Sequence, residues 1–374
     1  MQTMAGQIHQ SRFEQFERVI QAIEHHQLAE AGALLQAISE SLPAQQSDAE
    51  SIHTSFFLKA LEQRLSGSPA LDDNLYLLPD EGQQIQMFTF MAQQFPVVRY
   101  AQELMNQWHL QVLRGETRIL LWDIGMGNGQ QIVRLLQALI QEANAAGPEE
   151  ITIIGLEPSG ESLTEAEKAL QAFCDAAGVS LRFKGIAKTV EALQPTDWAE
   201  IAALTADFSG KWIANASFAL HHIHPTTTRT VFFKKIQTLK PAIFGFIEPY
   251  ADFLTPSLKD RFQHAWRHYG LAFWAIDQIE APLESRNLLK TVFFGREIMD
   301  VIGKDQARIE QFETGEMWGV RLKEAGWQCI PVSANHSAIP GFESIEIEQR
   351  EGFTAFLAQG YPVISLLGAK AGEP

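Results

Sequence analysis

The feature that most constrains the fold is a glycine-rich loop that follows an apolar strand. Residues 118–124 are strand-like, the pattern D-x-G-x-G-x-G runs from Asp123 to Gly129, and helical periodicity begins at Gln130. Glycines allow a sharp turn and a close approach of the backbone to a ligand, because a Cβ would collide. In open α/β sheets such a loop lies at the carboxyl end of a strand, where ligands bind. The pattern therefore predicts a parallel α/β sheet that carries a small-molecule site.

The chain after this loop alternates between strand-like and helix-like segments. Further strand-like runs are 151–156, 179–183, 211–216 and 242–248, and helices are expected at 130–144, 161–177 and 226–239. Such alternation predicts a mostly parallel sheet with helices on both faces. Two final β-runs, 328–332 and 361–367, complete the expected sheet. We therefore expect an α/β fold with a Rossmann-like, doubly wound, mostly parallel sheet.

Helical segments flank this core. The expected helices before the first strand are 13–23, 28–42, 52–65 and two within 84–113, the last two interrupted at Pro96. Residues 69–81 are rich in Asp, Asn and Pro, which favours a boundary there. We expect an N-terminal helical cap over 1–83 and a core over 84–374. An aromatic, helical insertion at about 250–292 follows the fifth strand and is expected to contribute to the cap.

Charge and composition exclude several classes of partner. The 374 residues include 45 acidic and 29 basic residues, a net charge of −16, which disfavours nucleic acid and anionic lipid. No apolar run approaches the ~20 residues of a membrane span. The two cysteines favour a reducing compartment, so the cytoplasm is expected. The oligomeric state is left open, and a homodimer is compatible with the sequence.

An acidic residue after the second strand narrows the class of ligand that the site is expected to bind. Glu157 follows 151–156, where a carboxylate can accept hydrogen bonds from ribose hydroxyls; the alternative is a surface residue that caps the next helix. Nicotinamide enzymes usually carry G-x-G-x-x-G. An acid two residues before G-x-G-x-G instead resembles class I S-adenosylmethionine-dependent methyltransferases. This resemblance implies S-adenosyl-L-methionine as cofactor and S-adenosyl-L-homocysteine as product. The residues that it implies for cofactor binding are Asp123, Gly125, Met126, Gly127, Asn128, Gly129, Glu157, Pro158, Ile186, Ala187, Asn215, Ser217 and Phe218.

Residues expected near the carboxyl ends of the strands, beside the cofactor site, are candidates for catalysis and for binding a methyl acceptor. His221 and His222 follow the fourth strand and Glu248 ends the fifth, so each can act as a base, or else only shape the site. The candidates for acceptor binding are Arg99, Tyr100, Asn106, Tyr250, Phe253 and Trp266. For the aromatic candidates, core packing is the alternative. No metal is expected, because no Cys or acidic ligand follows the histidines at a recognisable spacing.

A second resemblance spans most of the chain. The segments 29–35, 57–65, 96–108, 294–298 and 318–327 resemble parts of the GRAS family, which is best known for plant regulators. The chain is identified as a bacterial-type member, since it keeps three glycines that plant members have largely lost. Two hypotheses follow. One is a methyltransferase acting on a small apolar or aromatic molecule, and the other is a non-catalytic ligand-binding or regulatory protein that acts through a protein partner. Arg296 and Trp318 lie in family-like segments, and no role beyond structure is assigned to them.

Overall fold

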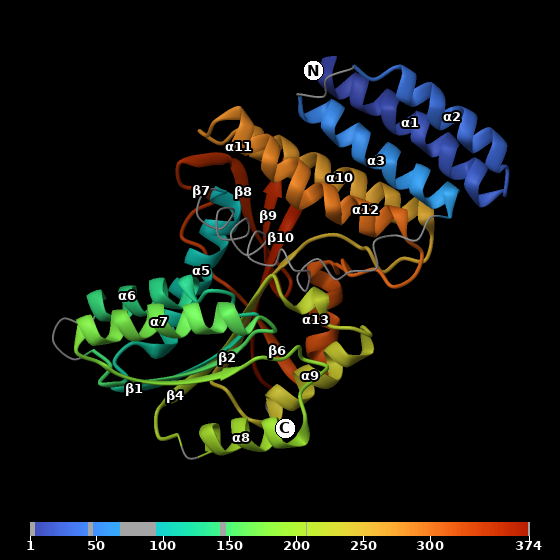
Figure 1. The fold of residues 1–374 in the computed structure, drawn as a ribbon. Coiled ribbons are helices and arrows are strands. Elements are labelled where there is room, and N and C mark those ends of the chain that lie inside the picture. The colour runs from blue at the N-terminus through green and yellow to red at the C-terminus, as the bar shows by residue number, and fades with distance from the viewer. Residues whose placement is uncertain (1–3, 44–47, 68–94, 143–146, 207, 373–374) are drawn as a thin grey trace. The chain divides into compact units, whose positions relative to one another are not determined.

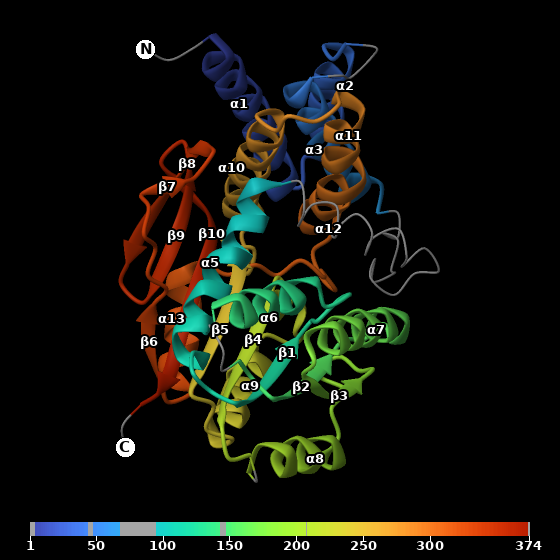
Figure 2. The ribbon, with the colours of Figure 1, turned by 90° about the vertical axis from the view of Figure 1, so that its left-hand side faces the viewer.

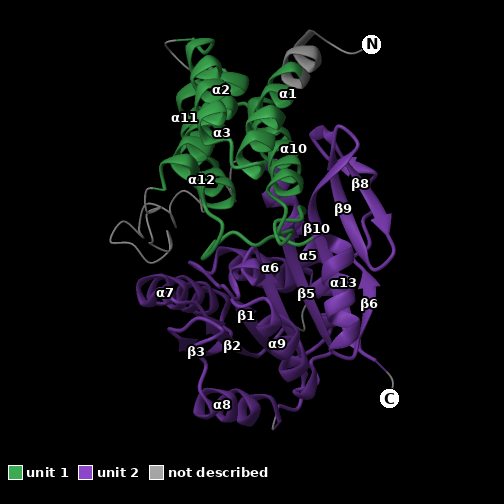
Figure 3. Cartoon of the chain, turned by 90° about the vertical axis from the view of Figure 1, so that its right-hand side faces the viewer, with its two compact units in different colours: residues 1–95, 250–313 green, residues 96–249, 314–374 purple. Residues whose placement is uncertain are grey.

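The chain is divided into two compact units. The computed structural model describes residues 4–43, 48–67, 95–142, 147–206 and 208–372. Unit 1 combines residues 1–95 with 250–313, and unit 2 combines 96–249 with 314–374 (Figure 3). Each unit is thus built from two separate stretches of sequence. The predicted boundary at residue 83 lies outside the described residues, and the role of the helical unit as a cap stays a prediction.

Unit 2 holds one mixed sheet, ordered β3-β2-β1-β4-β5-β10-β9-β8-β7, with β6 also paired to β10 (Figures 1 and 2). Its first five strands are β1 (Arg118–Ile124), β2 (Glu150–Leu156), β3 (Ser180–Ile186), β4 (Lys211–Ser217) and β5 (Ile243–Pro249). Its helices are α5 (Pro96–Leu113), α6 (Gln130–Glu142), α7 (Gly160–Ala177), α8 (Pro195–Ala206), the 3-10 turn η1 (Leu220–His222), α9 (Thr227–Thr238) and α13 (Gly315–Glu324). The pairs β1–β2, β2–β3, β1–β4 and β4–β5 are all parallel. The prediction of an α/β fold with a mostly parallel sheet is confirmed, and the parallel strands form the side of the mixed sheet that runs from β3 to β5.

Strand β5 shows how both faces of the sheet are covered. Successive side chains of a strand point to opposite faces. Phe244 and Phe246 pack against Phe233 of α9, and Phe246 also packs against Trp318 of α13. Gly245, between them, faces α5. Because neither face meets solvent, β5 is apolar at nearly every position.

The C-terminal part of the sheet differs from the prediction of two β-runs. It contains β6 (Trp327–Pro331), β7 (Ala338–Ile339), β8 (Phe342–Arg350), β9 (Phe353–Ala358) and β10 (Tyr361–Ala371). Strand β10 is antiparallel to β5, β6 and β9. The prediction missed β8 because that strand alternates acidic and apolar residues instead of forming a continuous apolar run. It also missed α8 between β3 and β4.

Unit 1 is helical. Its elements are α1 (Met4–Glu24), α2 (Leu28–Glu40), α3 (Ala49–Ser66), α10 (Leu258–Asp277), α11 (Leu283–Leu288), the π-helical turn η2 (Leu289–Phe294) and α12 (Gly295–Gly303). An aromatic core joins its two sequence stretches: Phe57 of α3 lies with its ring centroid 5.0 Å from both Phe262 and Trp266 of α10. Gly295 lies against the Phe56 ring, where a Cβ would approach within 2.3 Å. Helices α12 and α3 therefore pack closely.

None of the described helices is both long and apolar enough to cross a bilayer.

Candidate functional site

The glycine loop of unit 2 has the conformation that its sequence requires. Gly125, Gly127 and Gly129 have φ of +71°, +53° and +74°, a region that residues with a Cβ rarely adopt. A Cβ on Gly125 would lie 2.3 Å from Cβ of Ala219, in the turn after β4. A Cβ on Gly127 would meet no atom of the described segments within 4 Å. The loop is thus closed against the β4 turn at its start and borders open space at its middle.

Glu157 connects this loop to the end of β2. Its Oε2 accepts a hydrogen bond from the N–H of Gly127 at 3.0 Å, and its Oε1 accepts one from the N–H of Ser159 at 3.2 Å. The loop is also hydrogen-bonded to the end of β2: the N–H of Gly125 donates to the Leu156 carbonyl at 2.8 Å. An ionised carboxylate has about four acceptor positions, so Glu157 can also accept hydrogen bonds from a ligand.

Asp123 is buried behind the loop and paired with Asn215 of β4. Asn215 Nδ2 donates to Asp123 Oδ1 at 2.7 Å, and the two residues are opposite each other in the β1–β4 register. Burial raises the pKa of Asp123 to about 7; the hydrogen bond from Asn215 lowers it and the charge of Glu157 raises it further. The Oδ1 atom of Asn215 is buried and accepts no hydrogen bond from the described residues. An acceptor in this state fits a site where a ligand supplies the missing donor.

Glu248 is held by the turn that follows β4. Its Oε1 accepts hydrogen bonds from the N–H groups of Ala219, at 3.1 Å, and Leu220, at 2.7 Å. Phe218, just before them, has φ of +56°, and consecutive N–H groups in such a turn form a concave anion site. The Oε2 atom lies 2.5 Å from Nδ1 of His221. Glu248 is fully buried, so its carboxylate orders this turn and orients His221.

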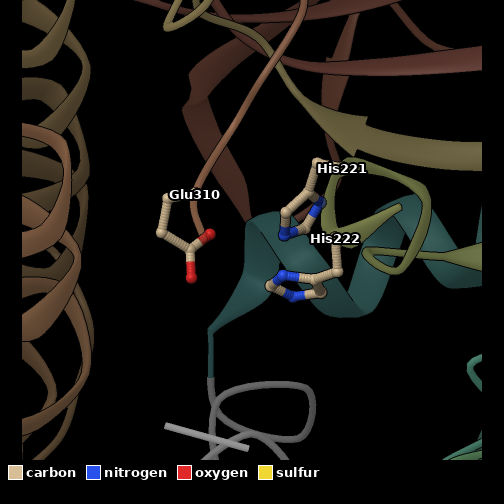
Figure 4. A group of neighbouring side chains, drawn as sticks. All are labelled: His221, His222 and Glu310. Carbon is tan, nitrogen blue, oxygen red and sulfur yellow. The ribbon is translucent and has the colours of Figure 1, made fainter. Parts of the chain in front are cut away.

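His221 and His222 are neighbours in space as well as in sequence (Figure 4). Their ring centroids are 3.9 Å apart and their planes are inclined by 51°. Burial lowers the pKa of His222 well below its ordinary value, and the nearby charges of His221, His224 and Arg229 lower it further. Arg229, which is not among the predicted site residues, is fully buried and donates to the His221 carbonyl at 2.5 Å. Its only sequence signal is an arginine between the predicted fourth and fifth strands.

Another residue that was not predicted, Gln131, links three elements behind the loop. Ser217 Oγ donates to Gln131 Oε1 at 2.7 Å, and Asn106 Nδ2 donates to the Gln131 carbonyl at 3.0 Å. Asn106, a predicted acceptor-binding residue, is therefore engaged in fastening α5 to α6. The only sequence signal for Gln131 is its position two residues after Gly129.

The remaining predicted site residues are distributed over both units. In unit 2, Ile186 ends β3 and its carbonyl accepts from the Glu157 N–H at 3.2 Å, whereas Pro158 and Ala187 are exposed. Tyr100 is buried against Phe356 of β9, and Arg99 is an exposed ion-pair partner of Glu103.

The other three predicted acceptor-binding residues belong to unit 1. Phe253 stacks on Phe312, and Trp266 packs against Phe16 at 5.4 Å between ring centroids. Tyr250 is half-buried. Phe253 and Trp266 thus take the alternative that the sequence left open for them, packing within a core, and their role in binding stays a prediction.

Comparison with known proteins decides the family. The GRAS domain family model matches residues 14–340. The chain belongs to the GRAS family. The solved structure of SCL7 from Oryza sativa, another protein of similar fold, covers 90% of this chain and 94% of its own, with a TM-score of 0.75 and 19% identity. The predicted resemblance to this family is confirmed.

Curated relatives of this GRAS chain are DELLA proteins. It is 24% identical to DELLA protein RGL1 of Arabidopsis thaliana, over 92% of this chain and 67% of the relative. It is also 24% identical to DELLA protein GAIP of Cucurbita maxima, over 95% of this chain and 61% of the relative. The chain thus spans about two thirds or less of the length of these relatives. They are plant proteins, and they give no support to the assignment as a bacterial type.

These matches correct the first functional hypothesis. The prediction of a methyltransferase, and of an enzyme, is wrong: the curated relatives are DELLA proteins of a family best known for regulators, and the structure with a high similarity is SCL7. The plantazolicin methyltransferase BpumL reaches a TM-score of only 0.40 at 10% identity, too low to support a shared activity. The physical reason for the error is that a glycine loop specifies a binding geometry and not a reaction.

Proposed function

We propose that this GRAS protein is a non-catalytic regulator that binds a small ligand in unit 2 and acts through a protein partner. The observation that carries the proposal is the family match over residues 14–340. Regulation through partners is what the GRAS resemblance implies, and it needs no catalytic group. The small-molecule methyl acceptor has no support and is not part of this proposal.

The ligand that the loop fits is a nucleoside with an amino-acid end, of the S-adenosyl-L-methionine or S-adenosyl-L-homocysteine type. Support comes from the three positive-φ glycines, the open space at Gly127, and Glu157 at the end of β2. Glu157 would accept hydrogen bonds from the ribose hydroxyls. Asp123 and Asn215 would face the amino-acid end, where Asn215 Oδ1 would accept from its amino group. Unit 2 would then be a Rossmann-like core that has kept binding.

Calorimetric titration of the full chain tests the ligand. We expect S-adenosyl-L-homocysteine and S-adenosyl-L-methionine to bind with one site per chain and NAD not to bind. Glu157→Ala should weaken both by at least about tenfold, because ribose hydrogen bonds to a charged acceptor are lost, typically about 1.5–3 kcal/mol each. Glu161→Ala, an exposed acid at the start of α7, is the matched control and should bind like the wild type. An unchanged affinity in Glu157→Ala, or no binding by the folded wild type, would overturn the ligand proposal.

The regulatory part needs a separate test with purified components. A protein captured by the full chain is to be purified and its complex reconstituted. We expect a defined stoichiometry and a dissociation constant that changes at least fivefold when S-adenosyl-L-homocysteine is added. Such a change requires that the ligand prefers one state of the protein. If every reconstituted complex has the same affinity with and without ligand, the ligand does not regulate partner binding.

A further inference from the structure

Three arginines of unit 1, which we call the arginine cluster, lie around one exposed aspartate. Arg64 is in the last turn of α3, Arg261 is in the first turn of α10, and Arg308 follows α12 (Figure 3). Arg64 Nη1 donates to Asp305 Oδ1 at 2.5 Å, and Arg261 Nη2 lies 3.5 Å from the same oxygen. One carboxylate oxygen thus serves two guanidinium groups.

Backbone carbonyls fix two of these arginines in place. Arg64 donates to the carbonyls of Ile302 and Lys304, both at 2.8 Å. Arg261 Nε donates to the carbonyl of Val301 at 3.0 Å. These carbonyls lie at the C-terminal end of α12, where a helix has no donors of its own for its last carbonyls. The two guanidinium groups are therefore ordered without an external ligand, which reduces the entropy cost of binding one.

The positive charge of the cluster is only partly matched by direct contacts. Arg308 Nη1 donates to the Phe253 carbonyl at 2.6 Å, and no ion pair joins Arg308 to a carboxylate of the described segments. Arg261 Nη2 is buried and has no hydrogen-bond acceptor among the described residues. Burial lowers the pKa of Arg261 to about 10, and the charges of Arg308 and Arg64 lower it further. The three cations therefore repel one another.

The other acids near the cluster have partners of their own. Asp300 Oδ1 lies 3.0 Å from Lys304 Nζ, and its Oδ2 accepts hydrogen bonds from the N–H groups of residues 309 and 310. Asp252 Oδ1 accepts hydrogen bonds from the N–H groups of residues 254 and 255. Asp305 is thus the carboxylate in direct contact with the cluster.

The contact with Asp305 is of a kind that another anion can replace. Its side chain is 72% exposed, and ion pairs with an exposed partner are weak. A phosphate monoester carries more negative charge than a carboxylate, has three terminal oxygens, and forms forked hydrogen bonds with guanidinium groups. We propose that the arginine cluster binds a phosphate group, which displaces the Asp305 carboxylate. The proposal rests on unit 1 alone and does not depend on the adenosyl ligand of unit 2.

Calorimetric titration of the full chain at low ionic strength tests the proposal. We expect inorganic phosphate and phosphoserine each to bind at one site per chain, and serine not to bind. Asp305→Asn should bind phosphate at least about tenfold more tightly, because a competing like charge is removed. Arg308→Gln should bind it at least about tenfold more weakly, because a charge-assisted hydrogen bond is lost. Comparable affinities for phosphate and phosphoserine identify the phosphate group as the ligand; tighter binding of phosphoserine indicates further contacts with the residue that carries it.

Glu142→Gln is the matched control. It removes the carboxylate partner of Arg114, a single exposed arginine of unit 2, and should bind phosphate like the wild type. A gain in Glu142→Gln equal to that in Asp305→Asn would show that any unpaired surface arginine suffices, and the proposal would be wrong.

Thermal melting distinguishes a phosphate site from an ion pair that only stabilises the fold. In chloride buffer Asp305→Asn should melt at a lower temperature than the wild type, and phosphate should raise its melting temperature more than that of the wild type. A lower melting temperature that phosphate does not restore contradicts the proposal, as does equal phosphate affinity in Asp305→Asn and the wild type. Because Asp305 is exposed, this variant is decisive if Arg308→Gln does not fold. These results are independent of whether S-adenosyl-L-homocysteine binds.

Discussion

At the scale of single residues, two buried groups give unit 2 opposite responses to pH. Burial raises the pKa of Asp123 to about 7 from 3.8, and burial lowers that of His109 to about 3 from 6.5. Both ring nitrogens of His109 are buried, and neither has a hydrogen-bond partner in the part of the chain that the structure describes. Folding therefore favours the protonated form of Asp123 and the neutral form of His109, so each group penalises folding where its charged form dominates in the unfolded chain.

Asp123→Asn should remove the first of these penalties. The wild-type carboxyl contributes stability below pH 3.8 that is lost as the pH rises through about 7. The variant keeps an acceptor for Asn215 and cannot ionise. Relative to wild type, it should gain up to about 4 kcal/mol between pH 4 and pH 8. Urea melts at both pH values, without ligand, measure this difference. If the free energies of unfolding of the two proteins differ by the same amount at pH 4 and at pH 8, the raised pKa of Asp123 is contradicted.

His109→Leu should act in the opposite pH range. The neutral histidine contributes stability above pH 6.5 that is lost as the pH falls toward 3. Between pH 7.5 and pH 4.5 the wild type should lose about 2–3 kcal/mol that the variant retains. His336→Leu, which replaces an exposed histidine, is the control for acid effects elsewhere. Parallel pH profiles of wild type and His109→Leu would show that the buried ring carries no penalty.

At the scale of elements, a pair of glycines sets how closely α5 approaches the sheet. Gly245 of β5 and Gly368 of β10 are opposite each other in the antiparallel register. A Cβ on Gly245 would lie 2.7 Å from both His109 Nε2 and Met105 Sδ, and a Cβ on Gly368 would lie 2.7 Å from the Trp108 ring. The hollow that these glycines leave in the sheet is filled by side chains of one helix.

Gly245→Ala should therefore destabilise unit 2. Overpacking of a filled interface costs about 1–3 kcal/mol, and the contacts here are below the distance that real Cβ atoms show. Gly319→Ala is the matched control, because its Cβ would meet no atom within 4 Å and it lies inside α13. That variant should gain about 0.5–1 kcal/mol from helix propensity. Equal urea midpoints for the two variants would count against the close approach of α5.

The secondary structure was predictable where the local sequence pattern reflects the burial of the element in the fold. Strands β1, β2, β4 and β5 are buried on both faces, so their apolar runs identified them. Strand β8 is antiparallel and alternates Glu343, Glu346 and Glu348 with apolar residues, so it gave no such signal. The number of C-terminal strands depends on pairing partners that lie far away in the sequence.

At the scale of the whole molecule, unit 1 is discontinuous in sequence. Helices α1 and α3 come from the start of the chain and α10 from the segment after β5. Phe16 and Phe57 are fully buried, and their rings lie 5.0–5.6 Å from that of Phe262. Neither stretch can bury these aromatic faces alone.

A fragment of residues 1–67 should therefore be poorly folded. Short helices without tertiary packing are marginal in water, and this fragment lacks Phe262 and Trp266. We expect low helicity by circular dichroism and no cooperative melt. Addition of the fragment 250–313 should raise the helicity above the sum of the two separate fragments. A cooperative transition by 1–67 alone would show that the N-terminal helices form their own core.

The sequence by itself determined the alternation of strands and helices and the conformation of the glycine loop. Both are local, because apolar runs and glycines act through the residues beside them. Family membership also followed from local sequence motifs that occur in order along the chain. The methyltransferase prediction failed because a glycine loop of this geometry does not by itself specify a reaction.

Only the tertiary structure decided which polar groups meet. It paired Glu248 with His221 and with the N–H groups of Ala219 and Leu220, and Asp123 with Asn215. The two residues of each pair lie 27 to 92 positions apart in the sequence. A buried polar group must find its partner wherever the sheet order brings one, and that order is set by packing over the whole unit.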